Sequence, residues 1–275
     1  MTARTILITG CSSGIGLASA KMMKARGWRV LATARRPEDL AMLRTEVGVD
    51  AIALELADPE SIAACAEAAL SLTGGSLDAL FNNAAYGQVG AVEDLTPETL
   101  RRQIEVNVIA QHDLTRRLVP AMRRQGHGRI VQCSSVLGLV AAPFRGAYCA
   151  SKFALEGLSD AMRIELAGAG IRVSLIEPGP IRTRFVENAL ANFLSTIDIA
   201  GSPHRALYEI RLARMREGGN DTFKLEPDAV AARLVHAVES PRPKSRYYVT
   251  KPTYFAAVLK RVAPQSTIDW FVQKM

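Results

Sequence analysis

Tyr148 and Lys152 are the two residues whose types and spacing most clearly suggest chemistry. They lie four positions apart, near the start of a predicted helix, and side chains at that separation share one helical face. A free phenol has a pKa of about 10 and is a poor proton carrier at neutral pH. A neighbouring ammonium stabilises the phenolate. The pair therefore predicts a Tyr148 pKa below its ordinary value, and a general acid/base for an alcohol oxygen.

Polar side chains at the ends of two predicted strands add to this pair. Ser134 and Ser135 directly follow one strand, and Asn82 ends another. The carboxyl ends of parallel strands meet at one edge of a sheet, where ligands bind. A serine hydroxyl at this edge can hydrogen-bond a substrate oxygen beside the phenol. Asn107 interrupts an apolar stretch of predicted helix, and such an asparagine is by itself more typical of a structural hydrogen bond than of catalysis.

Three glycines, Gly10, Gly14 and Gly16, fall between a predicted strand and a predicted helix. Glycine tolerates positive φ and lets the backbone approach a ligand closely. The free N–H groups at the start of a helix then face an anion such as a pyrophosphate. Tight turns also need glycine, but the strand before and the helix after favour a dinucleotide-binding loop.

The end of the second predicted strand indicates which dinucleotide binds. An NAD site places an acidic residue about twenty positions after the glycines, to accept from the ribose 2′-hydroxyl. This chain has Arg35 and Arg36 there instead. A guanidinium grips a 2′-phosphate with two hydrogen bonds, whereas a carboxylate repels it. The sequence predicts NADP(H) as the cofactor, with Arg35 as the better candidate; the alternative is that both arginines are solvated surface charges.

Short apolar runs alternate with helical patterns through the first two thirds of the chain. The runs are continuously apolar, as in a parallel sheet that is covered on both faces. We predict an α/β fold, a doubly wound parallel sheet (Rossmann fold) in three layers. The predicted strands cover residues 5–9, 28–34, 51–54, 77–82, 129–133 and 171–177, and the predicted helices cover 15–26, 59–72, 97–124 and 147–167.

The regular alternation ends after residues 178–180. Helical patches at 185–193 and 206–217, with a break at Gly218-Gly219-Asn220, predict a helical substrate lid at about 183–225. A further helix from about 226 and a last strand at 246–250 follow. Because the chain has no repeat, low-complexity tract or linker, we expect one domain, 1–275. The lid carries Phe185, Leu190, Phe193 and Leu194, which suit an apolar substrate or are simply core.

A helical extension is predicted at about 252–275. Its aromatic, aliphatic and basic residues are compatible with a helix on a membrane surface. Pro264 breaks any long amphipathic stripe. We therefore favour a segment that covers the active site or contacts another subunit.

Composition excludes several other classes of protein. The chain of 275 residues has a net charge of +7, but its basic residues are dispersed, so we expect no nucleic-acid binding. The four cysteines show no ligand-like or paired spacing, and they predict reduced thiols and a cytoplasmic location. The four histidines are also dispersed, and we expect no metal site. No apolar run is long enough for a membrane span.

The sequence resembles the short-chain dehydrogenase/reductase family over nearly its whole length. Six features carry the resemblance, in order along the chain. They are TGCSSGIG at Thr9–Gly16, NNAAYG at Asn82–Gly87, Asn107, Ser135, YCASK at Tyr148–Lys152 and PGPIRT at Pro178–Thr183. The resemblance implies that Asn107, Ser135, Tyr148 and Lys152 are catalytic. Asn107 would hold a water of the proton relay, and Lys152 would also bind the nicotinamide ribose.

The resemblance also implies the residues that bind the cofactor. Beside Tyr148 and Lys152 they are Gly10, Ser12, Ser13, Gly14, Ile15, Gly16, Arg35, Glu55, Leu56, Asn82, Ala84, Pro178, Gly179, Ile181 and Thr183. Two positions depart from the family pattern. Ala85 stands where the family usually has glycine, and Glu55 stands where it usually has aspartate, which makes the contact with the adenine amine less predictable.

Within the family, the chain is most similar to the hydroxysteroid and retinol dehydrogenase-like branch, and to bacterial NADP-dependent aldehyde reductases of that branch. This implies an aldehyde or ketone substrate of apolar character: an aliphatic aldehyde, a retinoid or a steroid. It also suggests a homodimer or homotetramer through the helices that start near Pro97 and Ala147. The alternative function is a cofactor-sensing protein without chemistry, which would be free to lose the four catalytic side chains.

Overall fold

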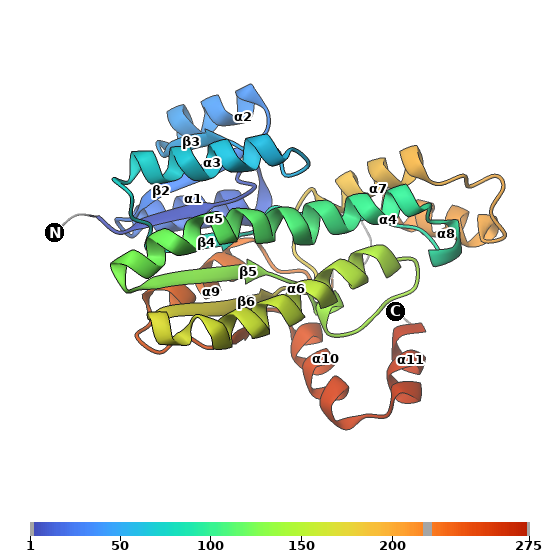
Figure 1. Ribbon diagram of the computed structural model, residues 1–275. Coiled ribbons are helices and arrows are strands. Elements are labelled where there is room, and N and C mark those ends of the chain that lie inside the picture. Colours follow the sequence, from blue (N-terminus) through green and yellow to red (C-terminus); the bar gives the residue numbers. More distant parts are fainter. Residues whose placement is uncertain (1–2, 217–221, 274–275) are drawn as a thin grey trace.

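The computed structural model describes residues 3–216 and 222–273. Within these residues the chain forms one sheet of seven parallel strands, in the order β3-β2-β1-β4-β5-β6-β7 (Figure 1). The strands are β1 (Thr5–Ile8), β2 (Arg29–Ala34), β3 (Asp50–Ala53), β4 (Ala79–Asn82), β5 (Gly128–Cys133), β6 (Ile171–Glu177) and β7 (Arg246–Tyr248). The order reverses between β1 and β4, where a doubly wound sheet opens a crevice for a ligand.

Helices cover both faces of this sheet. The buried residues of α1 and α9 pack on one face and those of α3 and α5 on the other, because alternate strand residues such as Ile6 and Leu7 point to opposite faces. Figure 1 shows α3, α5 and α6 on the near face. The α-helices of this part are α1 (Gly14–Ala25), α2 (Pro37–Met42), α3 (Pro59–Leu72), α4 (Pro97–Ile104), α5 (Ala110–Gln125), α6 (Gly146–Glu165) and α9 (Asp228–Glu239).

The predicted fold class is confirmed, and the predicted elements are found within a few residues of their expected ends. Two differences stand out. The helix expected at 97–124 is not continuous, because a π-helix, η3 (Glu105–Ile109), separates α4 from α5. The sequence analysis also missed α2 and the π-helical turn η1 (Leu43–Val47), which lie between β2 and β3.

The segment predicted as a lid contains α7 (Phe185–Thr196) and α8 (Arg205–Arg216), which lie beyond the carboxyl ends of the strands (Figure 1). Phe193 of α7 and Tyr208 of α8 are buried in a small core of their own, with Val89 and Ala91 from the loop after β4. Of the predicted lid residues, Phe193 is therefore core, whereas Leu194 is 50% exposed. The predicted break at 218–220, and the predicted range ends at 217 and 274–275, lie outside the described residues.

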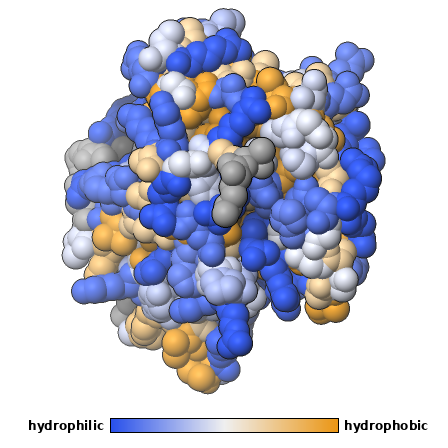
Figure 2. Space-filling view, turned by 90° about the vertical axis from the view of Figure 1, so that its left-hand side faces the viewer, coloured by the Kyte–Doolittle hydropathy of each residue, from blue (hydrophilic) through white to orange (hydrophobic). Residues whose placement is uncertain are grey.

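The last two helices, α10 (Lys251–Val262) and α11 (Gln265–Gln273), form a hairpin that projects from the body (Figure 1). Ala256 and Ile268 pack against Val140, in the loop that follows β5. Figure 2 shows the face of the molecule at the amino ends of the strands, and this face is mostly hydrophilic. Hydrophobic atoms gather at its lower end, which corresponds in height to the turn between α10 and α11 in Figure 1. In the part of the chain that the structure describes, no helix is both long and apolar enough to cross a bilayer.

Candidate active site

The glycine loop between β1 and α1 has the geometry of a phosphate cradle. Gly10 and Gly14 have φ of 72° and 55°, a region that disfavours other residues. A Cβ on Gly16 would lie 2.1 Å from the carbonyl oxygen of Gly10, so the turn excludes any larger side chain. The three glycines are therefore needed for backbone conformation and for close packing within the turn.

Neighbouring strands fix this loop in place. The amide of Asn83 donates to the carbonyl oxygen of Thr9 at 2.9 Å, and the Thr9 hydroxyl accepts from the N–H groups of Asn83 and Ala84, both at 2.9 Å. On the other side, the N–H of Gly10 donates to the Thr33 hydroxyl at 3.2 Å. The loop is thus held between β2 and the end of β4.

The start of α1 is open to an anion. Ser13, at the N-cap, makes no capping hydrogen bond, and the first turn contains no acidic residue. Ser12, Ser13 and Ile15 are all partly exposed. The unpaired N–H groups and the positive end of the helix dipole therefore face outward, as a pyrophosphate-binding helix requires.

The end of β2 presents Arg35 to solvent. Its side chain is 69% exposed and forms a 3.4 Å ion pair with Glu55. Arg36 instead is held by Asp39, with Nε 2.9 Å from the carboxylate. The Glu55 carboxylate also accepts from the N–H of Ala57 at 3.0 Å, while Leu56 is buried. Arg35 is therefore held less tightly than Arg36.

The predicted catalytic side chains converge at the carboxyl ends of β5 and β6. Tyr148 and Lys152 lie on the inner face of α6, and both are buried. Lys152 Nζ lies 5.6 Å from the centre of the Tyr148 ring and donates to the carbonyl oxygen of Cys133 at 2.8 Å. The Ser135 hydroxyl lies near the Tyr148 phenol, where it favours the ionised form, and it accepts from the N–H of Leu137 at 3.1 Å.

The prediction that Lys152 lowers the Tyr148 pKa is wrong for the chain by itself. Burial raises the pKa of Tyr148 above its ordinary value, and this effect outweighs the nearby Ser135 hydroxyl and the positive charge of Arg145, which act the other way. Burial also lowers the pKa of Lys152. Arg145, at the N-cap of α6, is the cation that acts on the phenol here.

Asn107 lies in the π-helix η3 and is fully buried. Its amide group accepts from the N–H of Tyr86 at 3.1 Å and donates to the Tyr86 carbonyl oxygen at 2.9 Å. It also lies 3.3 Å from the Ser151 hydroxyl, on the turn of α6 between Tyr148 and Lys152. The side chain therefore fixes the loop after β4 against α6, which is the structural role that its position alone suggested.

Asn107 belongs to a row of buried polar residues spaced by four: Gln103, Asn107, Gln111 and Thr115. Each of them bonds the segment from Asn82 to Gln88. Gln111 donates to the Ala84 carbonyl oxygen at 2.8 Å, and Thr115 accepts from the Asn82 amide at 2.8 Å. The whole of Asn82 is buried, with its side chain on Thr115, whereas Ala84 packs directly against Gly10.

The segment after β6 closes over the glycine loop. The Pro178 carbonyl oxygen accepts from the N–H of Val136 at 2.8 Å, which ties this segment to the loop of Ser135. A Cβ on Gly179 would lie 2.0 Å from the Thr250 hydroxyl, and one on Gly14 would lie 2.9 Å from Thr183 Cγ2. The structure thus brings the predicted cofactor residues of this segment, including Ile181, next to α1.

Phe185, in the segment predicted as a lid, contacts the predicted catalytic tyrosine. The rings of Phe185 and Tyr148 are edge to face, with centroids 5.5 Å apart. Gly87 lies against both rings and has no room for a Cβ beside Phe185. An apolar side chain of the lid therefore forms one wall beside the phenol.

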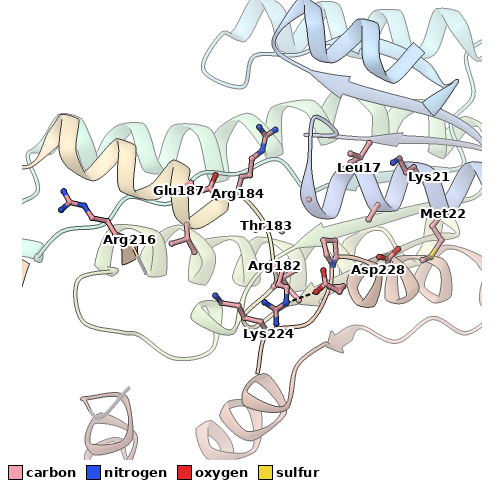
Figure 3. A pocket seen from close by; sticks show the side chains of 16 residues that line it. Leu17, Lys21, Met22, Arg182, Thr183, Arg184, Glu187, Arg216, Lys224 and Asp228 are labelled. Carbon is pink, nitrogen blue, oxygen red and sulfur yellow. Dashed lines mark ion pairs between the residues drawn. The ribbon is translucent and has the colours of Figure 1, made fainter. Parts of the chain in front are cut away.

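An open cleft of about 980 Å³ borders the start of α1, where Gly14 and Thr183 form part of its wall (Figure 3). Lys21, Arg182, Arg184, Arg216 and Lys224 line it together with three acidic residues. Arg182 pairs with Glu226 at 2.9 Å, shown by the dashed line. The cleft does not contain the catalytic side chains, but it places cations next to the start of α1.

Sequence reasoning missed two residues of this region. Asn83, within the NNAAYG motif, anchors the glycine loop, and Arg145 acts on the Tyr148 phenol. The position of Arg145, three residues before Tyr148 at the start of the same helix, could have suggested it. The four-residue spacing from Gln103 to Thr115 was a second available signal.

Comparison with known proteins agrees with this geometry. The pattern of the short chain dehydrogenase family matches residues 4–192. The chain belongs to this family. It is 43% identical, over 98% of its length and 94% of the relative's, to the uncharacterized oxidoreductase YbbO of Escherichia coli K12. It is 32% identical to human 17-beta-hydroxysteroid dehydrogenase type 1, over 91% of this chain and 79% of that protein.

A solved structure shows the same architecture along the whole chain. A short-chain dehydrogenase from Streptomyces avermitilis has a TM-score of 0.80 at 29% identity, and the alignment covers 99% of this chain and 97% of that one. The resemblance to the family is thereby confirmed. The protein is an oxidoreductase with the nicotinamide-cofactor chemistry that its family shares.

Proposed function

We propose that this protein is an NADP(H)-dependent oxidoreductase that interconverts an aldehyde or ketone with the corresponding alcohol. The observation that carries the proposal is the convergence of Tyr148, Ser135 and Lys152 beside a glycine loop at the carboxyl edge of the sheet. This arrangement provides a proton donor, a hydrogen bond to an oxygen and a cation at one place.

The residues present fit a dinucleotide. The cradle at Gly16 has no space for a Cβ, and the first turn of α1 contains no carboxylate that would repel a diphosphate. When bound, the cofactor supplies or accepts the hydride at the substrate carbon. Gly10, Gly14 and Ser13 would hold its diphosphate, and Thr183 and Pro178 would border its nicotinamide.

The protein's own side chains would manage the proton and the charge on oxygen. In the reducing direction, Tyr148 gives its proton to the carbonyl oxygen as negative charge develops there, and the Ser135 hydroxyl stabilises that charge. The phenol is protonated at neutral pH, as a proton donor must be, although burial makes it a weaker acid in the chain by itself. Lys152 would hold the ribose and, with the positive nicotinamide of the oxidised cofactor, favour the phenolate for the reverse reaction. Asn107 would hold a water that returns the proton.

The preference for NADP(H) rests on Arg35. Solved relatives do not decide it, since an actinorhodin polyketide ketoreductase was solved with NADPH and a Burkholderia phymatum dehydrogenase with NAD. Arg35 is exposed and lies where an NAD site has a carboxylate, and among the described residues one exposed ion pair, to Glu55, holds it. A 2′-phosphate can therefore displace this pair at small cost.

The substrate is proposed to be apolar. Phe185 stands against Tyr148, and the lid helices α7 and α8 bury their own apolar core above the site. Retinol dehydrogenase 8 of cattle is 34% identical over 88% of this chain and 80% of that protein, and together with the hydroxysteroid dehydrogenase it suggests retinoid- or steroid-like compounds beside aliphatic aldehydes. We also propose a cytoplasmic location, which the four free, buried cysteines support.

A turnover assay tests the reaction. NADPH absorbance is followed with a panel of aliphatic aldehydes, retinal and steroid ketones, for wild type and Tyr148→Phe. We expect turnover by the wild type and a loss of at least about 100-fold in kcat for the variant, with NADPH affinity retained. NADPH binding without turnover on any carbonyl would favour the cofactor sensor instead.

A second experiment tests the cofactor. Arg35→Asp should weaken NADPH binding by about 10-fold or more and leave NADH binding unchanged or improved, because the new carboxylate repels the 2′-phosphate and accepts from a 2′-hydroxyl. Arg36→Asp is the matched control, and we expect a smaller effect because Asp39 already holds Arg36. Equal losses for the two cofactors in Arg35→Asp would contradict the assignment.

A further inference from the structure

A group of buried charged side chains lies directly behind Lys152. On α6 the stripe that begins with Tyr148 and Lys152 continues, at the same four-residue spacing, with Glu156 and Asp160. The Glu156 side chain is only 9% exposed, and Glu177, the last residue of β6, is fully buried beside it. None of these three carboxyl groups has a part in the reaction described above.

One arginine faces all three carboxyl groups. Arg246 of β7 makes two hydrogen bonds to Asp160, at 3.0 and 2.8 Å, and one to Glu156 at 2.8 Å. Its Nε lies 3.1 Å from Glu177 Oε1. Asp160 is 37% exposed and also pairs with Arg163 at 3.2 Å. The buried carboxyl groups of Glu156 and Glu177 therefore share the single guanidinium of Arg246, which is already bound to the carboxylate of Asp160.

The lack of hydrogen-bond donors makes it unfavourable in free energy for Glu156 and Glu177 to be ionised at the same time. Among the described atoms, both oxygens of Glu177 and Oε1 of Glu156 are buried with no donor in hydrogen-bonding geometry. A carboxylate only accepts, so two carboxylates side by side leave these atoms unpaired, whereas a carboxylic acid can donate to its neighbour. Burial and the Glu156 charge raise the pKa of Glu177 to about 8.

We propose that Glu156 and Glu177 hold one proton between them, carried by Glu177 and donated to Glu156, and that Glu156 thereby acts as the buried counter-ion of Lys152. The two glutamates are positioning residues, because they act through Lys152 and not on the substrate. The counter-ion role of Glu156 rests on the function proposed above for Lys152. The sharing of one proton between the two glutamates does not depend on that function.

Several other titratable or polar groups lie near Lys152 and the two glutamates, and they are compatible with a protonated Glu177 beside an ionised Glu156. Cys133 faces Lys152, Tyr248 of β7 lies near both glutamates, and Arg261 of α10 acts on Tyr248. The Ser134 hydroxyl, next to the catalytic Ser135, faces Glu156 and favours its ionised form. Burial lowers the pKa of Lys152 and the negative charge of Glu156 opposes this effect, so a proton on Glu177 lets Glu156 keep its charge for Lys152.

Thermal unfolding tests the shared proton without any assay of activity. A carboxyl group with a raised native pKa stabilises the fold below its unfolded pKa of about 4.3, and this stability is lost as pH rises through about 8. Glu177→Gln stays neutral and keeps a donor at every pH. Its Tm relative to wild type should therefore rise by about 5 °C between pH 6 and pH 9. Glu165→Gln, at an exposed carboxylate of the same helix, should show no such trend.

The infrared spectrum gives a direct readout of the same proton. The wild type should show the carbonyl band of a protonated carboxylic acid at pH 7, and Glu177→Gln should lack it. A Tm difference that stays flat from pH 6 to pH 9, or a wild type without this band, overturns the shared proton.

The pH profile of alcohol oxidation tests the link to Lys152. Because Glu177 loses its proton near pH 8, above that pH the pair carries two negative charges in the wild type, one in either single variant, Glu156→Gln or Glu177→Gln, and none in the double variant. The pKa of Lys152 should therefore fall stepwise, and the alkaline limb should move to lower pH by about half a unit in each single variant and by about one unit in the double variant. A limb that stays in place in the double variant would overturn the counter-ion role of Glu156. Absence of turnover in the wild type would count against the proposed function, while the unfolding experiment would still test the pair.

Discussion

At the scale of single residues, the site depends on how burial and charge act on Tyr148. Burial holds its pKa above the ordinary value, and the nearby Ser135 hydroxyl and the positive charge of Arg145 oppose this effect. A protonated phenol at neutral pH suits carbonyl reduction, since the reaction needs a proton donor. Alcohol oxidation needs the phenolate, and its rate should therefore rise with pH through the Tyr148 pKa.

Replacement of Arg145 should shift that pH dependence. Arg145→Gln removes the positive charge that favours the phenolate, so the Tyr148 pKa should rise further. We expect the acidic limb of kcat/KM for alcohol oxidation to move to higher pH by about half a unit to one unit. Arg124→Gln, at an exposed arginine of α5, should leave the limb in place. A limb that moves to lower pH in Arg145→Gln would contradict this reading of the phenol.

The residues that sequence reasoning found are those whose role is local. The spacing of Tyr148 and Lys152 and the three glycines of the first turn are visible in a short stretch of sequence, and the structure places both groups as expected. Asn83 and Glu177 were not found, because their importance comes from contacts with Thr9 and Glu156, far away in the chain. The direction of the Tyr148 pKa shift was wrong for the same reason, since burial is a tertiary property.

At the scale of elements, the π-helix η3 and the polar row around it fix the loop that follows β4. Gln103, Asn107 and Gln111 replace apolar side chains on the inner face of α4, η3 and α5, and they satisfy backbone groups of residues 84–88. This loop in turn contacts the glycine loop through Ala84. The buried hydrogen bonds of this row therefore help to fix the position of the glycine loop that is predicted to hold the cofactor.

Gln111→Met tests this connection. The variant keeps the volume but leaves the Ala84 carbonyl oxygen without its donor, which should cost about 1–3 kcal/mol in the free energy of unfolding. Because Ala84 packs on Gly10, cofactor binding should weaken as well. Urea unfolding and a fluorescence titration with NADPH measure the two effects. The exposed Gln265→Met serves as the control; a Gln111→Met protein as stable as that control would refute the role of the row.

Strands and long helices were predictable because their apolar runs and caps are local signals. The helix α3 was predicted with its observed ends, since Pro59 follows Asp58, whose side chain caps the helix by accepting from Glu60. The short α2 was missed because it has only six residues and continues into a π-helical turn that ends at Gly48, with φ of 69°. The break at η3 was not visible, because it depends on hydrogen bonds to Tyr86.

At the scale of the whole molecule, α6 carries the predicted catalytic residues on one face and an apolar surface on the other. Its outward face shows Ala150, Phe153, Gly157, Ala161 and Ile164, and Phe153 and Ile164 are 40% and 70% exposed. Small and apolar residues at this spacing allow a second helix to pack closely. We therefore propose that the expected homodimer or homotetramer forms through α6 and the neighbouring α4 and α5.

Light scattering tests this interface. Phe153→Glu should reduce the molar mass in solution to that of a smaller oligomer or the monomer, because it places a charge in the centre of the contact. Phe255→Glu, at a 53% exposed residue of the C-terminal hairpin, is the matched control and should leave the mass unchanged. Dissociation by Phe255→Glu alone would assign the subunit contact to α10 and α11 instead.

A crystal structure with NADP and a trapped alcohol tests the central claim most directly. The account predicts the dinucleotide along the carboxyl edge of the sheet, with its diphosphate at Gly14 and its 2′-phosphate at Arg35. It predicts the alcohol oxygen within hydrogen-bond distance of both the Tyr148 and Ser135 hydroxyls. A dinucleotide bound elsewhere, or an alcohol that contacts neither hydroxyl, would contradict it.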